Sequence, residues 1–488
     1  MSDWFLPAFE RPWSEGNLVT PLVHGSDYFG RVADVVGGAA AGDRVFFTDW
    51  RGDADELLTD TGPTVRQLLC DAARRGVEVR GLLWRSHSDL LKFSAQQNRR
   101  LGTEINEAGG EVLLDQRVRR GGSHHQKLLV VQHPSRPQDD CAFVGGIDLC
   151  HSRRDDSGHH GDPQRQPMDR RYGARPPWHD AAVQIQGPAV GDVAATIAER
   201  WDDPTPLDHR NPYRMLLQRA ARMPRRAPRL PPMLPPPPPA GPHAVQVLRT
   251  YPAKTPAFPF AADGERSIAR AYAHAFARAE KLIYIEDQYL WSEVVARALA
   301  EALRRQPRLQ VIAVVPRYPD QDGRVTGPAN RLGQLSAVGL LAAAGGERFG
   351  VYDLVGDSGV PIYVHAKVCI VDDEWMTCGS DNFNRRSWTH DSEATCAIVD
   401  RAGVLPRALR LRLWSEHLAL PPDEGRMLDL ERAASLWRDR ASAESPARAR
   451  PHRPSPLPRL GRLWATPLYR LVYDPDGRPA RLRRGNEF

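Results

Sequence analysis

Hydrophobic positions along the chain follow two alternating periods. Short runs in which nearly every residue is apolar are separated by longer segments with apolar residues three and four apart, the pattern of an amphipathic helix. Because strands that alternate with helices are typical of βαβ units, we predict an α/β protein with largely parallel or mixed sheets. Strands are predicted at 43–50, 77–85, 282–291 and 309–317, and helices at 65–76, 267–281 and 294–306.

A proline- and arginine-rich stretch divides this pattern into two parts. It contains the run "LPPPPPAGPH", which favours an extended polyproline conformation and does not suit a packed core. We therefore predict a first domain at 1–205, a linker at 206–243 and a second domain at 244–420. Residues 421–488 are predicted to form a helix, a flexible stretch and, at "PLYRLVYDPDGRP", a strand and turn that pack back on the core.

Four landmarks recur in the same order in both parts. An aspartate ends an early strand (Asp49 and Asp287), then His-x-Lys enters an apolar run ("HHQKLLVV" and "VHAKVCIVDD"), then a Gly-containing turn follows ("AFVGGIDL" and "WMTCGSDNFN"). A carboxylate then opens another apolar strand, as Asp180 in one part and Glu393 in the other. This internal duplication predicts two similar α/β/α sandwich domains that pack as a pseudo-dimer, with one site at their interface.

The chain uses lysine very sparingly. Of 66 lysine and arginine residues only five are lysine, and two of these, Lys127 and Lys367, stand two residues after His125 and His365. Residues two apart in a strand share a face, so each lysine is expected to project beside its histidine. Lysine supplies a compact charge for phosphoryl oxygens, and two imidazoles can act as nucleophile and as general acid. The pattern predicts a site for a tetrahedral anion.

Composition adds a few limits. The net charge of +6 favours an anionic partner without identifying it. No apolar run approaches the length of a spanning helix, and the N-terminus lacks the pattern of a secretory signal. The six cysteines show no CxxC spacing, so we expect a reduced, cytoplasmic protein that can associate peripherally with the inner membrane face.

One histidine-rich segment invites a metal-site interpretation. "HSRRDDSGHHGDPQ" contains His151, His159 and His160, but their spacing fits no usual zinc pattern. A polar loop is therefore predicted there. We expect no metal ion and no other cofactor.

The paired motifs resemble those of a known family. His125 with Lys127, and His365 with Lys367 and Asp372, resemble the two HKD motifs of the phospholipase D superfamily. The contexts "PWHDAAVQIQGPAVGDV", "LIYIEDQYLW" and "CGSDNFNRRSW" look like those of phosphatidylcholine-type phospholipases D. The resemblance implies a mechanism in which His125 forms a covalent phosphohistidine and His365 protonates the leaving alcohol and later activates the acceptor.

Further residues follow from this resemblance and from the alignment of the repeats. Because each imidazole needs a carboxylate on its far nitrogen, we expect Asp180 and Glu393 to orient the two rings. The first motif departs from the family pattern, since Gln132 stands where Asp372 stands in the second, and that aspartate is interpreted as a turn residue. The predicted substrate-binding residues are Asn382, Ser380, Asp148, Gly146, Glu286 and Gln288.

The resemblance implies hydrolysis or transfer at a glycerophospholipid phosphodiester, giving phosphatidate and a free head group. The expected partner is phosphatidylcholine or a related lipid at a membrane surface, bound by a monomer. Three alternatives stay open: an HKD nuclease, a cardiolipin-synthase-like phosphatidyltransferase, and an idle phosphate-binding protein. Small nucleases of the family carry one motif and dimerise, so two motifs in one chain argue against a nucleic-acid partner.

Overall fold

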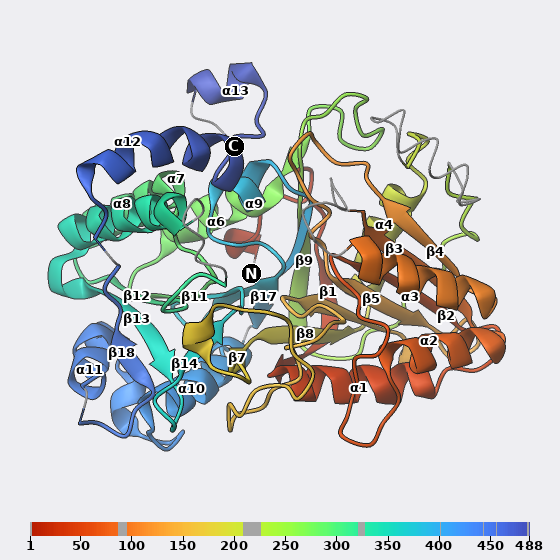
Figure 1. The fold of residues 1–488 in the computed structure, drawn as a ribbon, viewed down its shortest axis with the longest axis horizontal. Helices are drawn as coiled ribbons and strands as arrows, with labels where there is room; N and C mark the ends of the chain where they lie inside the picture. The colour runs from red at the N-terminus through yellow and green to blue at the C-terminus, as the bar shows by residue number, and fades with distance from the viewer. Residues whose placement is uncertain are drawn as a thin grey trace.

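The protein forms two sheet-and-helix bodies that lie side by side (Figure 1). Every helix within the described ranges is too short or too polar to cross a lipid bilayer. The computed structural model describes residues 2–85, 95–207, 226–320, 327–400, 402–442, 444–454, 456–485 and 488.

The first sheet is mixed. Its strands run in the spatial order β4–β3–β2–β5–β6–β8–β1, in which β2, β3 and β4 are parallel and the other neighbours are antiparallel. The strands are β1 (Ser14–Val23), β2 (Arg44–Asp49), β3 (Glu78–Trp84), β4 (Glu111–Asp115), β5 (Leu128–Gln132), β6 (Cys141–Gly145) and β8 (Ala181–Gln186).

The second sheet repeats this arrangement. Its order is β13–β12–β11–β15–β16–β17–β9, again with three parallel strands followed by antiparallel neighbours. This strand-by-strand correspondence confirms the predicted duplication and the mixed sheets. The strands are β9 (His243–Tyr251), β11 (Leu282–Glu286), β12 (Gln310–Val314), β13 (Phe349–Val355), β15 (Val368–Val371), β16 (Trp375–Gly379) and β17 (Glu393–Asp400).

The two sheets meet at corresponding edges. β1 pairs with β9 in antiparallel orientation, with Asn17 opposite His243. A short strand of the first half, β7 (Trp178–His179), pairs in parallel with β14 (Pro361–Val364) of the second. His124 forms an isolated bridge with Ser392. These contacts bring the segments that carry the motifs of both halves together.

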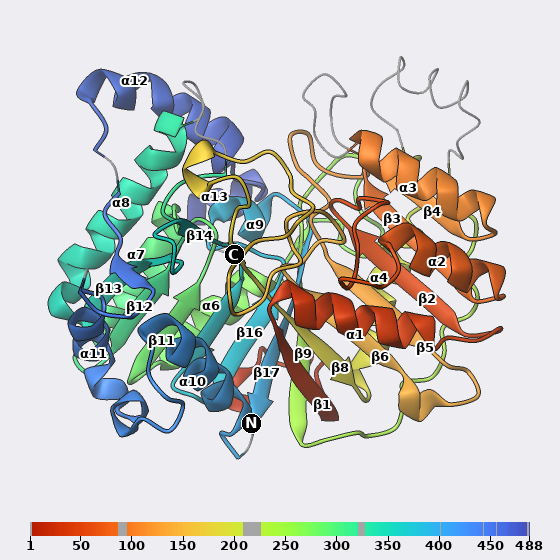
Figure 2. The same cartoon turned by 60° about the horizontal axis from the view of Figure 1, so that its bottom comes forward.

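Helices cover both faces of each sheet, as Figure 2 shows. The helices are α1 (Gly25–Gly37), α2 (Val65–Arg74) and α3 (Ala95–Glu107) on one face of the first sheet and α4 (Ala189–Trp201) on the other; α6 (Ser267–Arg278), α7 (Glu293–Arg305), α8 (Gly327–Gly345) and α9 (Arg385–Thr389) on one face of the second and α10 (Leu405–Leu418) and α11 (Ala433–Arg440) on the other. Apolar residues of α4 and α10, such as Ile197 and Trp414, belong to one core that runs through both halves. The expected pair of α/β/α sandwiches is therefore confirmed.

Local sequence explains where elements begin. At α2, the Thr64 hydroxyl accepts the N–H of Gln67 while the Gln67 side chain accepts the N–H of Thr64, a reciprocal cap that satisfies two donors at the helix start. The strand predicted over 282–291 is shorter than expected and ends at Glu286. The remaining short elements are β10 (Glu265–Arg266) and the single turns at Ser2–Trp4, Pro137–Asp139, Arg170–Tyr172, Gly346–Arg348, Gly425–Leu428 and Leu430–Arg432.

The predicted linker lies partly outside the described residues, at 208–225. Its described remainder, 226–242, forms no helix or strand. It is held against the first half by Trp201, whose indole N–H donates to the Pro228 carbonyl at 2.7 Å, and by Arg44, which donates to the Pro232 carbonyl at 2.9 Å.

The C-terminal prediction was wrong in two places. The segment "PLYRLVY", predicted as a strand, is the end of helix α12 (Arg459–Leu468) and a π-helical turn, Tyr469–Tyr473. The stretch predicted to be flexible contains strand β18 (Ala449–Pro451), which pairs with β13. A last helix, α13 (Ala480–Gly485), follows. The tail does pack back, since the Tyr469 hydroxyl donates to the Trp291 carbonyl at 2.8 Å.

Candidate active site

The two His-x-Lys motifs lie immediately before strands β5 and β15. The expectation that each pair shares a strand face is therefore wrong, because neither pair is in strand conformation. Each lysine nevertheless folds back beside its histidine. Lys127 Nζ donates to the His125 carbonyl at 3.2 Å, and Lys367 Nζ donates to the His365 carbonyl.

The carboxylate that contacts His125 comes from the other half. Nδ1 of His125 lies 2.9 Å from Oε2 of Glu393, which also accepts the Ser380 hydroxyl at 2.5 Å. Burial, with the neighbouring charge of Asp391, raises the pKa of Glu393 to about 8. Burial, with the charge of Lys127, holds the pKa of His125 well below its usual range.

His365 is paired in the same crosswise manner. Its Nδ1 lies 2.7 Å from Oδ2 of Asp180, which the first half supplies. Burial opposes ionisation of Asp180, but the charges of His365 and Lys367 lower the pKa of this carboxyl to about 2. Burial and the charge of Lys367 lower the pKa of His365 to about 3. Each half thus supplies an imidazole and the carboxylate for the other half's imidazole.

The two lysines belong to one electrostatic site. Lys127 Nζ lies 3.1 Å from Asp148 Oδ1, and Lys367 Nζ donates to Gln288 Oε1 at 3.4 Å. Burial lowers the pKa of Lys367 to about 8, and the charge of Lys127 acts in the same direction. The charge of Lys367 also lowers the pKa of His125. The charges of the two motif lysines therefore act within one region of the protein.

Glycine is required at one predicted position. A Cβ atom added to Gly146 would lie 2.4 Å from Oδ1 of Asp180 and 3.2 Å from Cδ of Lys367, so any side chain there would displace one of them. Of the other predicted residues, Asn382 is buried with no hydrogen-bond partner for Oδ1 among the described residues. Ser380 supports Glu393 with its hydroxyl.

Two predicted pocket residues have different positions. Gln288 contacts Lys367 and also donates to the Tyr363 hydroxyl at 2.8 Å, so it lies at the site. Glu286 does not line the site. It is fully buried behind it, with Oε2 2.7 Å from Nε2 of His179 and Oε1 2.8 Å from Nε2 of His417. The expectation for Glu286 is corrected because both of its carboxylate oxygens are engaged by His179 and His417.

The aligned aspartates that end the early strands hold the site loops. Asp49 Oδ2 accepts the N–H of Leu149 at 2.8 Å, and Asp287 Oδ1 accepts the N–H of Phe383 at 2.9 Å. Asp372 accepts three consecutive backbone N–H groups at 280–282. This supports its interpretation as a turn residue, so its replacement by glutamine in the first motif removes no group from the site.

Two neighbours of His365, Trp178 and Arg153, were not predicted from the sequence. The ring of Trp178 lies 5.1 Å from the His365 ring, and the guanidinium of Arg153 lies 4.0 Å from the Trp178 ring. Arg153 also lies 3.5 Å from Asp148. Trp178 directly precedes His179 and Asp180, so its place next to the aligned carboxylate was a usable signal. Nothing in the sequence around Arg153 distinguishes it from the other arginines.

The arrangement has definite chemical capacities. Both imidazoles are mainly neutral at neutral pH, and their Nδ1 atoms are engaged, so Nε2 is the nitrogen left to attack or to carry a proton. Two ammonium groups beside them can neutralise the oxygens of a bound phosphodiester. The side chain of His125 is 16% exposed and that of His365 only 6%, so solvent reaches the site from the His125 side.

Fold and site together define a duplicated α/β protein with a paired histidine–lysine centre. Family models described as "Phospholipase D" and "Cardiolipin synthase, PLD-like domain" match residues 45–223 and 272–406. The chain belongs to the phospholipase D superfamily.

Similar proteins include phospholipase D alpha 2 of Arabidopsis thaliana, 25% identical, with 78% of this chain and 62% of that protein covered. Phospholipase D A of Dictyostelium discoideum is 26% identical, with 86% of this chain and 36% of that protein covered. The chain thus spans less than two thirds of these relatives. Among solved structures, phosphatidylserine synthase of Haemophilus influenzae Rd KW20 has the same fold, with a TM-score of 0.54 at 16% identity over 84% of this chain and 86% of that one.

Proposed function

We propose that the protein is a phospholipase D-type phosphodiesterase, which hydrolyses glycerophospholipids or transfers their phosphatidyl group to an alcohol. The observation that carries this proposal is the crosswise pairing of His125 with Glu393 and of His365 with Asp180 around two lysines. Each motif histidine takes its carboxylate from the other half. The complete centre has the groups that a two-step displacement at phosphorus needs: two imidazoles and two cations.

In the first step, Nε2 of His125 attacks phosphorus. A nitrogen–phosphorus bond forms, the bond from phosphorus to the head-group oxygen breaks, and His365 gives its proton to that oxygen. Lys127 and Lys367 neutralise the other phosphoryl oxygens. The negative charge of the bound phosphodiester offsets Lys367, whose charge lowers the pKa of His365. Substrate binding therefore favours the protonated His365 that this step requires.

In the second step, His365 is neutral and acts as a base. It accepts a proton from water, the water oxygen bonds to phosphorus, and the bond to His125 breaks, which releases phosphatidate. An alcohol in place of water gives a new phosphatidyl ester. This is the second candidate function, and it is supported by the match of the second half to a model described as "Cardiolipin synthase, PLD-like domain".

The surroundings of the two carboxylates support this division of roles. Asp180 is ionised beside His365 and can stabilise the imidazolium that forms there. Glu393, with its pKa raised to about 8, is mostly protonated at neutral pH and has little negative charge. It therefore does not favour protonation of His125, which must be neutral to attack phosphorus. His125 therefore has the nucleophilic role, and its greater exposure gives a lipid access to it.

The proposed partner is a lipid surface, and the proposed location is the reducing interior of the cell. The six cysteines are all free and buried, which supports a reducing compartment.

The test is a head-group panel. Purified protein should release choline from phosphatidylcholine vesicles, and added ethanol should divert part of the product to phosphatidylethanol, which only transfer can form. His125→Ala and His365→Ala should each abolish choline release. Cleavage of single-stranded DNA without any choline release would favour a nuclease instead, and lipid binding without turnover in the parent protein would favour an idle phosphate-binding protein.

A further inference from the structure

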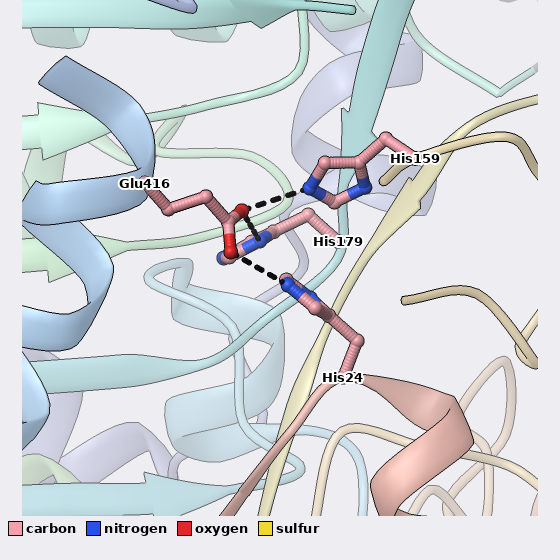
Figure 3. A group of neighbouring side chains, drawn as sticks. All are labelled: His24, His159, His179 and Glu416. Atoms are coloured by element: carbon pink, nitrogen blue, oxygen red, sulfur yellow. Dashed lines mark hydrogen bonds and ion pairs between the residues drawn. The ribbon is translucent and has the colours of Figure 1, made fainter. Parts of the chain in front are cut away.

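A second group of polar side chains lies behind the candidate active site, in the region where the two halves meet. We name His24, His159, His179 and Glu416 the histidine cluster (Figure 3). His24 directly precedes α1, His159 lies in the loop between β6 and β7, His179 is in β7, and Glu416 is in α10. The three imidazoles are at most 1% exposed, whereas the Glu416 side chain is 13% exposed. The cluster is buried with one side close to solvent.

The three rings converge on one carboxylate. Nε2 of His24 lies 3.0 Å from Oε2 of Glu416, and Nε2 of His159 lies 2.8 Å from Oε1. Nδ1 of His179 lies 3.9 Å from the same Oε1, and all four ligand atoms lie within 4.8 Å of one another. Zinc–nitrogen bonds of 2.0–2.1 Å in a tetrahedron separate ligand atoms by about 3.3 Å. The observed separations lie on both sides of that value.

Hydrogen bonds on the far side of two rings decide where their lone pairs point. Nδ1 of His159 lies 3.1 Å from the Trp178 carbonyl oxygen, which can only accept a hydrogen bond, so Nδ1 carries the proton. When the ring is neutral, its Nε2 therefore directs a lone pair at Glu416. Nε2 of His179 likewise donates to Glu286 at 2.7 Å. Its Nδ1 then faces Glu416 and has no hydrogen-bond partner among the residues that the structure describes.

Lone pairs that face a carboxylate repel it unless a cation lies between them. A proton can fill this role at His159, whose Nε2 lies within hydrogen-bond distance of Glu416 Oε1, at 2.8 Å. At 3.9 Å, however, Nδ1 of His179 is too far from Oε1 for a hydrogen bond. A metal ion satisfies both nitrogens at once. The bonds from His159 and His179 to acceptors behind them are those that orient metal-binding histidines.

The charges around the cluster also fit a divalent cation. Asp155 lies 3.6 Å from Nδ1 of His159, Glu286 lies behind His179, and Arg448 lies 3.6 Å from Oε1 of Glu416. The cluster and its neighbours thus contain three carboxylates, Asp155, Glu286 and Glu416, and one guanidinium. If the imidazoles are neutral, these side chains together have a net negative charge. Three nitrogen ligands and one oxygen ligand match zinc-class ions better than calcium or magnesium, which prefer oxygen.

We propose that the histidine cluster binds one divalent transition-metal ion of the zinc class. The ion would connect the loop and strand of the first half to α10 of the second. His179 precedes Asp180, and its carbonyl accepts the N–H groups of His365 and Ala366 at 2.8 and 3.2 Å. The site therefore has a structural role: it fixes the segment that carries Asp180 and the backbone that carries His365.

This proposal departs from the expectation that the protein holds no metal ion, and it involves one of the three histidines of the 151–160 segment. His151 lies against Asp53 and Asp55, and His160 is exposed, so of that trio only His159 joins the cluster.

The test is metal binding by the full chain without substrate, so its result does not depend on the proposed activity. Protein purified without a polyhistidine tag should retain about one zinc per chain by mass spectrometry of its metal content. Chelator-treated protein should bind one equivalent of zinc chloride by calorimetry. Cobalt chloride should give the intense visible bands of a tetrahedral site.

Matched variants locate the site. Glu416→Gln keeps the shape of the side chain and should weaken zinc binding at least about 10-fold and remove the cobalt bands. His160→Ala, in the same loop as His159, should bind like the parent. At a zinc concentration close to the parent's Kd, zinc should raise the melting temperature of the parent and of His160→Ala more than that of Glu416→Gln. Absence of saturable zinc binding by the parent, or equal affinity in the parent and Glu416→Gln, would overturn the proposal.

Discussion

Substitution of Asp180 by asparagine should reduce turnover sharply while the fold is retained. The carboxylate has three donors around it: the N–H of Ala181 at 2.9 Å on Oδ1, and the Trp178 indole N–H at 3.3 Å and Nδ1 of His365 at 2.7 Å on Oδ2. An amide has only one acceptor oxygen. If that oxygen keeps the Ala181 bond, the NH₂ group faces His365 and shifts the proton of the ring from Nδ1 to Nε2. His365 then cannot accept a proton from water.

The magnitude follows from the bond that is lost. A hydrogen bond to a charged group contributes about 1.5–3 kcal/mol, and each 1.36 kcal/mol of barrier is a factor of ten in rate. Loss of this bond to the His365 imidazolium therefore predicts that kcat of Asp180→Asn falls by roughly 10- to 150-fold. The change of tautomer would add to this loss.

Glu393→Gln is the matched comparison. Because the pKa of Glu393 is raised to about 8, this group is largely protonated at pH 7, and its replacement by an amide removes little charge. We expect a loss of less than about 10-fold. The assay is steady-state choline release at pH 7, with circular dichroism to check folding. If Glu393→Gln loses as much activity as Asp180→Asn, or more, the assignment of the acid to His365 is wrong.

Three further predictions test other parts of the account. KM for phosphatidylcholine should rise as pH increases through about 8, because Lys367, whose lowered pKa is about 8, loses there the charge that binds phosphate; a flat KM from about pH 7 to 9 would contradict this. Gly146→Ala should lose at least about 100-fold in kcat with little change in circular dichroism, since the new Cβ would displace Asp180 or Lys367; parent-like activity would show that this contact is not needed. Asp474→Ala should lower the free energy of unfolding in urea by about 1–3 kcal/mol, because the buried carboxylate accepts the N–H of Arg386 at 3.1 Å; an unchanged midpoint would show that the C-terminal tail adds no stability.

The fold was predictable because its signal is periodic and repeated. Strands such as β2 and β12 are buried on both faces and therefore appear as continuous apolar runs. The duplication was visible because equivalent residues make equivalent contacts. Asp49 accepts a backbone N–H from the loop after β6, and Asp287 accepts one from the loop after β16. Residue type, spacing and order carry that information without any knowledge of how the halves pack.

The failures have a common physical origin in tertiary contacts. "PLYRLVY" is rich in residues that favour strands, but it continues helix α12, and its Tyr469 hydroxyl donates to the distant Trp291 carbonyl. The aligned carboxylates do contact the two imidazoles, but their crosswise pairing depends on how the two halves meet. The histidine cluster combines His24 with Glu416, nearly the whole chain apart, and no local spacing reveals such a set.

The most direct test of the central claim is a burst experiment with a phosphatidyl ester of p-nitrophenol. This leaving group needs no acid, so His365→Ala should still complete the first step but lack the base for the second. The account predicts a rapid burst of one p-nitrophenolate per chain, with a phosphatidyl adduct on the peptide that contains His125 by mass spectrometry, and no burst from His125→Ala. A burst of equal size from His125→Ala, or an adduct on any other residue, would contradict it.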